Sequence, residues 1–266
     1  MTIDCNVLDH LVILGRERNP DAECSCPLEV RSLVPAPIAN RLLSRLTAPD
    51  LGLLRPHLKD VDLPLRKRLE TPRKIIEQIY FPESGFVSVV ADGVANQRVE
   101  VGMIGLEGMT GLAVLLGTDR SPNETFVQNA GKGLRMPATE LRKAMERSGT
   151  LRSHLLLYAH AFLVQATQTA RANSRSKLEE RLARWLLMAH DRLGTDDLVI
   201  THEFLSMMLG VRRPGVTVGL NLLERAALIR IHRGVISIID RTGLKRAANG
   251  AYGVAEAEFS RLFGQA

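Results

Sequence analysis

Arginine is concentrated in one short stretch of the sequence. Between residues 204 and 233 there are five arginines and a single acidic residue, Glu224. Arginine carries a planar fork of donors that pairs with the edge of guanine and with phosphate oxygens. The stretch therefore indicates binding to nucleic acid, and the formal net charge of +6 favours the same class of partner.

Two short helices can present these arginines. Thr201 is a suitable N-cap for a first helix that runs to about Leu209, and Gly210 permits a sharp turn because glycine tolerates positive φ. A second helix follows from about Arg212, with Pro214 in its first turn, where a missing N–H costs little. Its expected buried stripe is Val216, Leu220, Leu223 and Ala227. The pattern predicts a helix-turn-helix, whose second helix directs its N-terminal residues toward base edges.

Two short strands follow the second helix. They lie within residues 229–239, on either side of Arg233-Gly234, and predict a hairpin with a basic tip that reaches phosphates. Such a hairpin is the wing of a winged helix-turn-helix. The DNA-binding residues expected for the whole unit are Thr201, His202, Arg212, Arg213, Gly215, Thr217, Arg230 and Arg233.

Other chemistries find little support. The sequence has no His-Glu-x-x-His motif, nucleophile elbow or P-loop, so no catalytic residue is expected. His154 and His160 are six residues apart on an expected helix and do not share a face, so neither a metal site nor a cofactor is expected. The sequence has three cysteines, Cys5, Cys24 and Cys26, and this odd number argues against a disulfide framework. An iron–sulfur cluster usually needs four thiolates.

The elements before residue 148 are shorter. A helical segment is expected at 38–58, and short strands and turns follow from about 61 to 136. The expected strands are 74–81, 86–91, 98–101 and 124–128. Many short strands at this spacing predict a small barrel or jelly roll. Glycines recur at Gly102, Gly105, Gly108 and Gly111, and they are expected to form tight turns of this barrel.

A long helix is expected from Ser148 to about Ala172, and it carries two apolar stripes. The first stripe is Leu151, Leu155, Tyr158, Phe162, Gln165, Thr169 and Ala172; the second is Leu156, Ala159, Leu163, Ala166 and Ala170. One face can cover the barrel while the other requires a partner. A homodimer is expected, held by Leu155, Tyr158, Phe162 and Thr169. A capping box at Ser176 and Glu179 then predicts a new helix.

At this point the chain resembles the Crp/Fnr family of bacterial transcription regulators. The segments that carry the resemblance are 81–85 (FPESG), 108–112 (GMTGL), 181–188 (RLARWLLM) and 201–213 (THEFLSMMLGVRR), and they look like a rhizobial-type branch of the family. The resemblance implies an α+β chain with a cyclic-nucleotide-binding-like jelly roll, a long dimerisation helix and a C-terminal winged helix-turn-helix. The expected segments are 1–37 (flexible extension), 38–147 (sensor), 148–174 (dimerisation helix), 175–250 (DNA-binding domain) and 251–266 (tail).

The resemblance also implies partners, namely double-stranded DNA, a second copy of the chain and RNA polymerase, with an effector that the sequence does not identify. Neither a membrane span nor a signal peptide is recognisable, so a cytoplasmic protein is expected. An alternative hypothesis is a module that binds a small molecule and for which DNA binding is secondary.

Two departures from the family pattern alter the expected specificity. The effector pocket would contain Thr110, Gly111, Leu112, Arg120 and Ser121, but the acidic residue that cyclic-AMP binders of the family place in this turn is missing. Cyclic AMP is therefore not an expected effector. In the recognition helix the family pattern is Arg-Glu-x-x-x-Arg, and here Pro214 and Val218 stand at its second and last positions. The operator should accordingly differ from that of the cyclic-AMP members.

Overall fold

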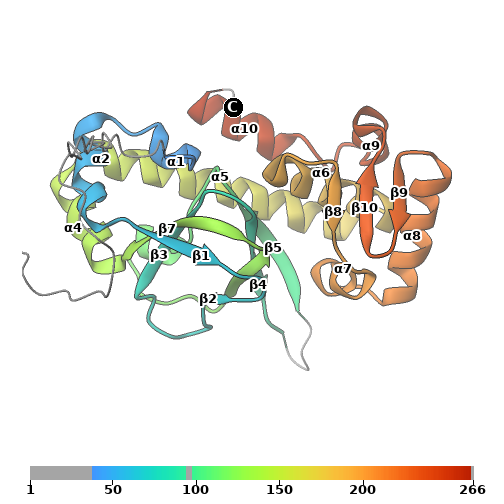
Figure 1. Cartoon of the computed structure of the whole chain (residues 1–266), viewed down its shortest axis with the longest axis horizontal. Coiled ribbons are helices and arrows are strands. Elements are labelled where there is room, and N and C mark those ends of the chain that lie inside the picture. Colours follow the sequence, from blue (N-terminus) through green and yellow to red (C-terminus); the bar gives the residue numbers. More distant parts are fainter. Residues whose placement is uncertain (1–37, 94–97, 265–266) are drawn as a thin grey trace, which may run out of the picture. The chain divides into compact units, whose positions relative to one another are not determined.

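The computed structural model describes residues 38–93 and 98–264. It is an α+β structure in which a β-barrel, a long helix and a small winged domain follow one another along the chain (Figure 1). The expected extension at 1–37, with Cys5, Cys24 and Cys26, lies outside the described residues. No helix in the described residues is long and apolar enough to span a membrane.

The segment before the barrel is not one helix. It contains three short pieces, α1 (Arg41–Ser44), α2 (Ala48–Leu54) and η1 (Arg55–His57). Thr47 interrupts the helix because its hydroxyl caps α2, accepting the N–H of Asp50 at 3.3 Å. Pro49 then takes the first turn of α2, the one place where a helix tolerates proline.

Seven strands build the barrel as two antiparallel sheets, ordered β1-β7-β3 and β2-β6-β4-β5. The strands are β1 (Lys59–Leu63), β2 (Arg68–Glu70), β3 (Gln78–Pro82), β4 (Phe86–Ala91), β5 (Val99–Ile104), β6 (Glu124–Asn129) and β7 (Gly131–Pro137). The jelly roll is therefore confirmed, and β4 pairs with β5 in an antiparallel arrangement. The short strands β1, β2 and β7 were not predicted individually because they are mostly polar or carry glycine.

The regularly spaced glycines serve both turns and close packing: the N–H of Gly108 donates to the carbonyl of Gly105 at 3.1 Å and closes the predicted kind of turn, while Gly102 and Gly108 allow a close approach. A Cβ at Gly102 would lie 2.6 Å from the ring of Phe162, and one at Gly108 would lie 2.4 Å from the hydroxyl of Tyr158. Both aromatic residues belong to the long helix, which therefore needs glycine in order to approach the barrel this closely. Gly111 does have a left-handed backbone, with φ of +81°, at the start of the short helix α3 (Leu112–Leu115).

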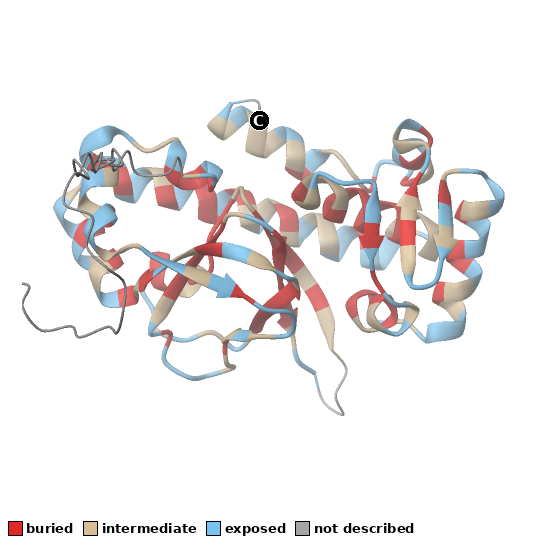
Figure 2. Ribbon diagram, viewed as in Figure 1, coloured by how far each residue is buried: buried red, intermediate tan, exposed pale blue. Residues whose placement is uncertain are grey.

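The long helix α5 (Gly149–Arg175) follows α4 (Ala138–Arg147) and begins where the sequence predicts. The Ser148 hydroxyl caps it by accepting the N–H of Leu151 at 3.1 Å. Figure 2 shows that buried residues gather in the barrel strands and along one side of this helix. The Tyr158 hydroxyl donates to the carbonyl of Met109 at 2.9 Å and ties α5 to the loop after β5.

The stripe expected to join two chains is covered by the barrel of its own chain. Leu155 and Tyr158 are buried, and half-buried Phe162 packs against the barrel core. Thr169 accepts a hydrogen bond from Arg184 at 3.1 Å. Periodicity identifies apolar faces of a helix, but it does not say which face the rest of the chain will cover. Leu155 and Tyr158 are thus not available to a second chain, while Phe162 and Thr169 are partly occupied by contacts within their own chain.

The C-terminal part folds around a three-stranded sheet ordered β8-β10-β9. Its elements are α6 (Leu178–Leu193), β8 (Asp197–Val199), α7 (His202–Leu209), α8 (Arg213–Arg225), β9 (Ile229–His232), β10 (Val235–Ile238) and α9 (Arg241–Ala247). The N-cap of α6 is Lys177, one residue later than the predicted Ser176. Its N–H donates to the side chain of Glu180, rather than Glu179, at 2.9 Å.

The segment expected to be a C-terminal tail contains a further helix, α10 (Val254–Phe263). The Glu256 side chain caps its start by accepting the N–H of Gly253 at 2.9 Å. The helix packs along α5, where the ring of Phe263 lies edge-on to His154 at 5.2 Å and Glu258 pairs with His160 at 3.1 Å (Figure 1). Its apolar residues bury against α5, which is why this segment does not behave as a tail.

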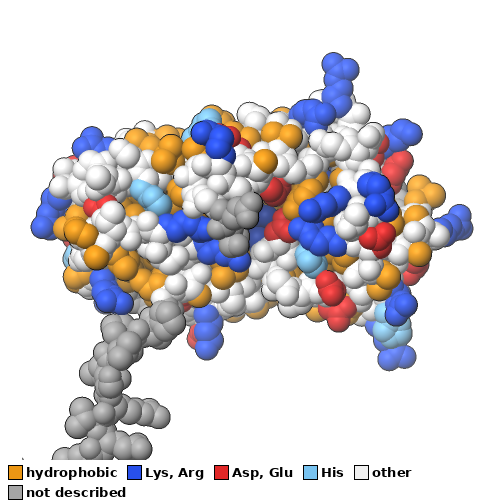
Figure 3. All heavy atoms as spheres, turned by 90° about the horizontal axis from the view of Figure 1, so that it is seen from above, with side chains coloured by type: hydrophobic (Ala, Val, Ile, Leu, Met, Phe, Trp, Pro, Cys, Tyr) orange, Lys and Arg blue, Asp and Glu red, His pale blue; other side chains and the backbone are white. Residues whose placement is uncertain are grey.

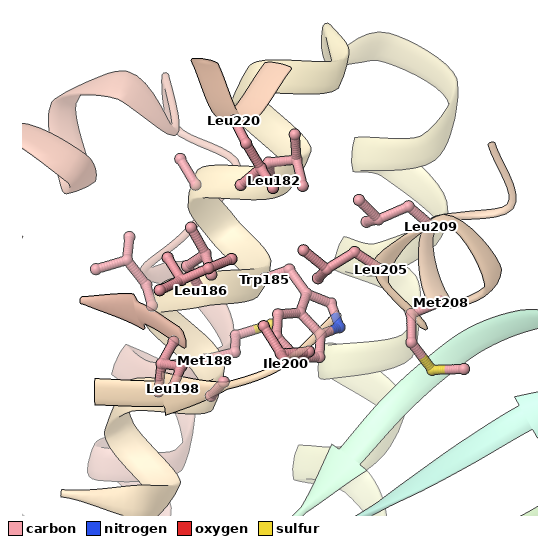
Figure 4. Close-up of a cluster of buried hydrophobic side chains, with 14 of the residues drawn as sticks. Leu182, Trp185, Leu186, Met188, Leu198, Ile200, Leu205, Met208, Leu209 and Leu220 are labelled. Atoms are coloured by element: carbon pink, nitrogen blue, oxygen red, sulfur yellow. The ribbon is translucent and has the colours of Figure 1, made fainter. Parts of the chain in front are cut away.

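Trp185 of α6 links the winged domain to the barrel. It lies among leucines of the winged-domain core (Figure 4), and its indole nitrogen donates to Glu100 of β5 at 2.9 Å. The second oxygen of Glu100 accepts from the Ser88 hydroxyl at 2.5 Å. Burial raises the pKa of Glu100 to about 7, although both hydrogen bonds favour the charged form.

This buried carboxyl predicts a pH-dependent stability. A carboxyl whose pKa is raised by folding stabilises the fold fully below its unfolded pKa, and that contribution is lost as the pH rises through about 7. Glu100→Gln keeps an uncharged hydrogen-bonding group in place, so we expect it to be more stable than the natural protein at pH 8, by roughly 2–3 kcal/mol.

Urea unfolding of both proteins between pH 5 and pH 8 measures the effect. Glu146→Gln, which removes an exposed carboxylate from α4, is the control and should keep the pH dependence of the natural protein. Parallel stability curves for the natural protein and Glu100→Gln over this range would contradict the assignment.

Candidate nucleic-acid interface

The helix-turn-helix is built by local interactions that the sequence makes recognisable. The Thr201 hydroxyl caps α7 by accepting the N–H of Phe204 at 3.2 Å. Gly210 ends the helix with φ of +61°, and the N–H of Val211 donates to the carbonyl of Ser206 at 2.9 Å. The chain then turns directly into α8, with Pro214 in the first turn. The predicted pair of helices is confirmed.

The buried side of α8 packs on α6. Val216, Leu220 and Leu223 are buried, as predicted, and Gly219 joins them because a Cβ there would lie 2.5 Å from Leu182. The fourth predicted member, Ala227, is exposed. It lies beyond the end of α8 with φ of +56°, so the stripe stops one turn earlier than its spacing suggested.

The outer side of α8 combines polar and apolar groups. Arg213, Thr217 and Asn221 are spaced four residues apart and lie along one line of the helix. Val218 is 61% exposed beside them. Asn221 was not among the predicted residues, although its position eight residues after Arg213 would have identified it. Asparagine and arginine side chains both suit bidentate contacts to purines, and an exposed aliphatic group suits the methyl of thymine.

Several residues predicted to contact DNA also have structural contacts within the domain. Thr201 is occupied as the helix cap, and His202 Nδ1 lies 3.0 Å from the Thr217 hydroxyl. A Cβ at Gly215 would lie 3.1 Å from Leu178, so this glycine faces α6. These residues therefore position α8, whereas Arg212 and Arg213 are exposed at its start.

The wing is formed by β9 and β10, which pair antiparallel. Ile229 lies opposite Ile238 at one end of the hairpin, and His232 lies opposite Val235 at the other. Its tip is Arg233-Gly234, both with positive φ, +45° and +81°. This conformation suits a two-residue hairpin. The predicted hairpin is confirmed, and Arg230 and Arg233 are exposed on it.

The arginines of this surface are not neutralised within the described part of the chain. No ion pair is formed there by Arg212, Arg213, Arg225, Arg230 or Arg233. Glu224, the one acidic residue nearby, accepts the N–H of Ile231 at 2.7 Å and so fixes the start of the wing. On the face that Figure 3 shows, basic side chains are interspersed with acidic ones, so the local cluster in the sequence, rather than the overall charge, marks the candidate surface.

Residues 180–247 match the family profile of the Crp-like helix-turn-helix domain. This segment is a Crp-like helix-turn-helix domain. Its bounds run from the first turn of α6 to the end of α9, and they enclose both the arginine cluster and the wing. No curated protein matches the chain.

Solved structures of Crp/Fnr-type regulators share the fold of the described chain. A crp/fnr-family structure from Eubacterium rectale is 17% identical, with a TM-score of 0.64, over 79% of this chain and 98% of its own. FixK2 from Bradyrhizobium japonicum is 15% identical, with a TM-score of 0.63, over 71% and 96%. CLP from Xanthomonas campestris, a c-di-GMP-responsive global regulator, is 16% identical, with a TM-score of 0.58, over 72% and 99%. At these identities the likeness establishes the fold.

The residues expected to form an effector pocket have contacts within the described chain. Thr110 is buried and its hydroxyl accepts the N–H of Tyr80 at 3.0 Å. Leu112 is half-buried in α3, and Arg120 is exposed and pairs with Asp119 at 3.3 Å. Ser121 accepts the N–H of Asn123 through its hydroxyl at 3.1 Å. Arg120 and the turn at 110–112 therefore each have their own partners within the chain.

A carboxylate of the protein itself occupies the start of α3. Glu70 of β2 is buried, and its oxygens accept the N–H of Gly111 at 2.6 Å and the Thr125 hydroxyl at 3.1 Å. Burial raises the pKa of Glu70, against the lowering effect of these hydrogen bonds. The sequence offered no signal for this contact, because it joins residues 41 positions apart. Among the described residues no group of His, Cys, Asp and Glu could hold a metal ion.

Proposed function

We propose that the chain is a sequence-specific transcription regulator that binds double-stranded DNA as a homodimer. The observation that carries this proposal is the set of unneutralised arginines at the start of α8 and on the wing. Arg213, with Thr217 and Asn221 behind it on the helix, faces the bases in the major groove. Arg230 and Arg233 bind phosphates from the wing. RNA polymerase is the further partner that a regulator of this kind would contact.

The homodimer forms through the remaining open face of α5. The barrel and α10 cover two sides of this helix. On the third side lie four members of the second sequence stripe, Leu156, Leu163, Ala166 and Ala170, while the fifth member, Ala159, is buried against its own chain. The spacing of the stripe alternates between three and four residues, the repeat of a coiled coil. Leu156 is 39% and Leu163 is 60% exposed, large values for leucines in a regular repeat. A second copy of the helix covers them.

The barrel does not take cyclic AMP in the position that the family pattern suggests. The Glu70 carboxylate already accepts the N–H at the start of α3, the group that would otherwise face a phosphate. A phosphate entering there would meet this carboxylate in a buried setting, and two like charges repel strongly at low dielectric.

Titration calorimetry checks this expectation directly. Cyclic AMP added to the full chain should produce no saturable heat up to about millimolar concentration, because the anion position is filled. A titration with cyclic GMP serves as the control for non-specific heats. A site of micromolar affinity for cyclic AMP would contradict the proposed role of Glu70.

Selection of genomic DNA fragments by the purified protein tests the proposed function. Fragments from the source genome should be enriched for a common two-fold symmetric site, and the protein should bind that site more tightly than a scrambled version in a gel shift. The alternative hypothesis, a small-molecule binding module with secondary DNA binding, requires equal affinity for the site and the scrambled sequence. That result would overturn the proposal.

A further inference from the structure

A cavity of about 260 Å³ lies beneath α10 and is separate from the residues expected for an effector. Arg41 of α1 lines it, and its other walls come from four parts of the chain: the end of β5 and the following loop, α5, the last turn of α6, and α10. Glu107, Phe162, Arg192 and Ala255 represent these parts in that order. An occupant would therefore contact the barrel, the long helix and the first helix of the DNA-binding domain at once.

One side of the cavity is apolar. Met103, Ala161, Phe162, Ala255 and Phe259 contribute to it. Ligand sites in proteins are mostly apolar, carry a few well-placed polar groups, and often occur where structural units meet. The volume is just below the range typical for drug-sized molecules, which limits the occupant to a smaller one.

The charged residues on the other side largely neutralise one another. Arg192 is 8% exposed and pairs with Glu107 at 2.6 Å. Asp191 accepts from Arg241 and from the Tyr252 hydroxyl, both at 2.5 Å. This leaves Arg41 and Glu256, which carry opposite charges, at the edge of the cavity. A ligand with a full charge would gain no net attraction and would lose its hydration, so a neutral ligand is favoured.

A hydroxyl remains available for hydrogen bonding on this polar side. The Ser260 hydroxyl lines the cavity, and no hydrogen bond to it occurs among residues 38–93 and 98–264. A ligand oxygen can accept a hydrogen bond from this hydroxyl. The occupant should therefore carry a hydrogen-bond acceptor.

We propose that this cavity is an effector site for a small neutral molecule with an aromatic or alicyclic body and one acceptor oxygen, such as a cyclic ketone or a phenol. Because the cavity joins Asp191 and Arg192 of α6 to the barrel and α5, its occupancy stabilises one placement of the DNA-binding domain. The site itself is independent of the function proposed above. Its regulatory role rests on that function.

Fluorescence titration with prodan, a neutral naphthalene ketone whose emission shifts in apolar surroundings, tests the site. The full chain should bind one prodan per subunit, and should bind anilinonaphthalene sulfonate, an anionic naphthalene, at least tenfold more weakly. Ala255→Phe fills the cavity and should weaken prodan binding at least tenfold. Ser260→Leu fills it from another position and should do the same if Ala255→Phe does not fold. Ala257→Phe, two residues along α10 on an exposed position, is the matched control and should bind as the natural protein does.

The outcomes separate the site from its role. No saturable prodan binding, equal binding by the filled and natural cavities, or tighter binding of the sulfonate would overturn the site. Saturating prodan should also change the affinity for the selected DNA site at least threefold in the natural protein and in Ala257→Phe, but not in Ala255→Phe. Tight prodan binding with unchanged DNA affinity would overturn the effector role, while the fragment selection described above would still stand.

Discussion

The variant Leu156→Glu plus Leu163→Glu should be monomeric and should bind the operator at least a hundredfold more weakly than the natural protein. In the proposed dimer the two leucines of one α5 face their counterparts on the other, so the double substitution places four carboxylates in one apolar seam. Burying unpaired charges of one sign costs more free energy than the apolar contacts of this seam contribute to association. The affinity for DNA falls when the dimer is lost, because a monomer contacts only one half-site. Binding two linked half-sites typically raises the affinity by a factor of about 10²–10⁴.

Light scattering measures the mass, and a gel shift with the selected operator measures the affinity. Both leucines are exposed in the single chain, so the variant should fold. Leu65→Glu plus Ile75→Glu is the matched control: it also replaces two exposed aliphatic residues, 59% and 55% exposed, by carboxylates, but on the barrel rather than on α5. The control should remain dimeric. A dimeric Leu156→Glu plus Leu163→Glu protein would refute this face as the interface.

The choice of dimer face illustrates what the sequence could and could not predict. The repeat of apolar residues in α5 predicts the helix and its apolar faces, because it depends only on helix geometry. Which stripe a second chain covers depends on where the barrel lies, and that is set by contacts such as Tyr158 with Met109, 49 residues apart. The helix α10, which covers a further side, approaches from about a hundred residues downstream, as the pair His160–Glu258 shows. Neither contact can be predicted from the apolar repeat of α5 alone.

Features set by neighbouring residues were predictable. Ser148, Thr201 and Gly210 cap or end their helices through hydrogen bonds within three to five residues. The tip at Arg233-Gly234 follows equally from local backbone preference. Glycine spacing in the barrel was more ambiguous, because glycine permits both a positive φ and a close approach. Only the position of α5 shows that Gly102 and Gly108 serve the approach.

The predicted helices and hairpin of the helix-turn-helix domain are confirmed, whereas the residues that contact DNA stay a prediction. The exposed arginines could be recognised because charge excess is a property of composition. Thr201, His202 and Gly215 lie in the same segment but hold the helices together, a distinction that requires the partners of each side chain. The Glu70 contact with α3 is similarly beyond the sequence, because an acid within β2 gives no indication that it will meet a backbone N–H of another element.

Two arginines of the proposed DNA surface should respond differently to removal. Arg213 lies at the start of α8, where side chains reach base edges, and a bidentate arginine–guanine pair discriminates by about 1–3 kcal/mol. Arg213→Ala should therefore lose most of the preference for the operator at each half-site while weak binding to scrambled DNA survives. Arg233 lies at the tip of the wing, where contacts go to phosphates and carry no sequence information. Arg233→Ala should weaken binding to all sequences about equally.

Affinities for operator and scrambled DNA at several salt concentrations separate the two effects. Removing one phosphate-binding arginine should reduce the slope of log affinity against log salt by about one per subunit, so Arg233→Ala should flatten the dependence for both DNAs. Arg120→Ala removes the same charge from an exposed position in the barrel and should change neither quantity appreciably. An alternative role for Arg213, pairing with Glu224, is disfavoured because that carboxylate is engaged by Ile231. If Arg213→Ala keeps the natural ratio of operator to scrambled affinity, Arg213 does not read bases, and the line through Thr217 and Asn221 would have to supply the specificity without it.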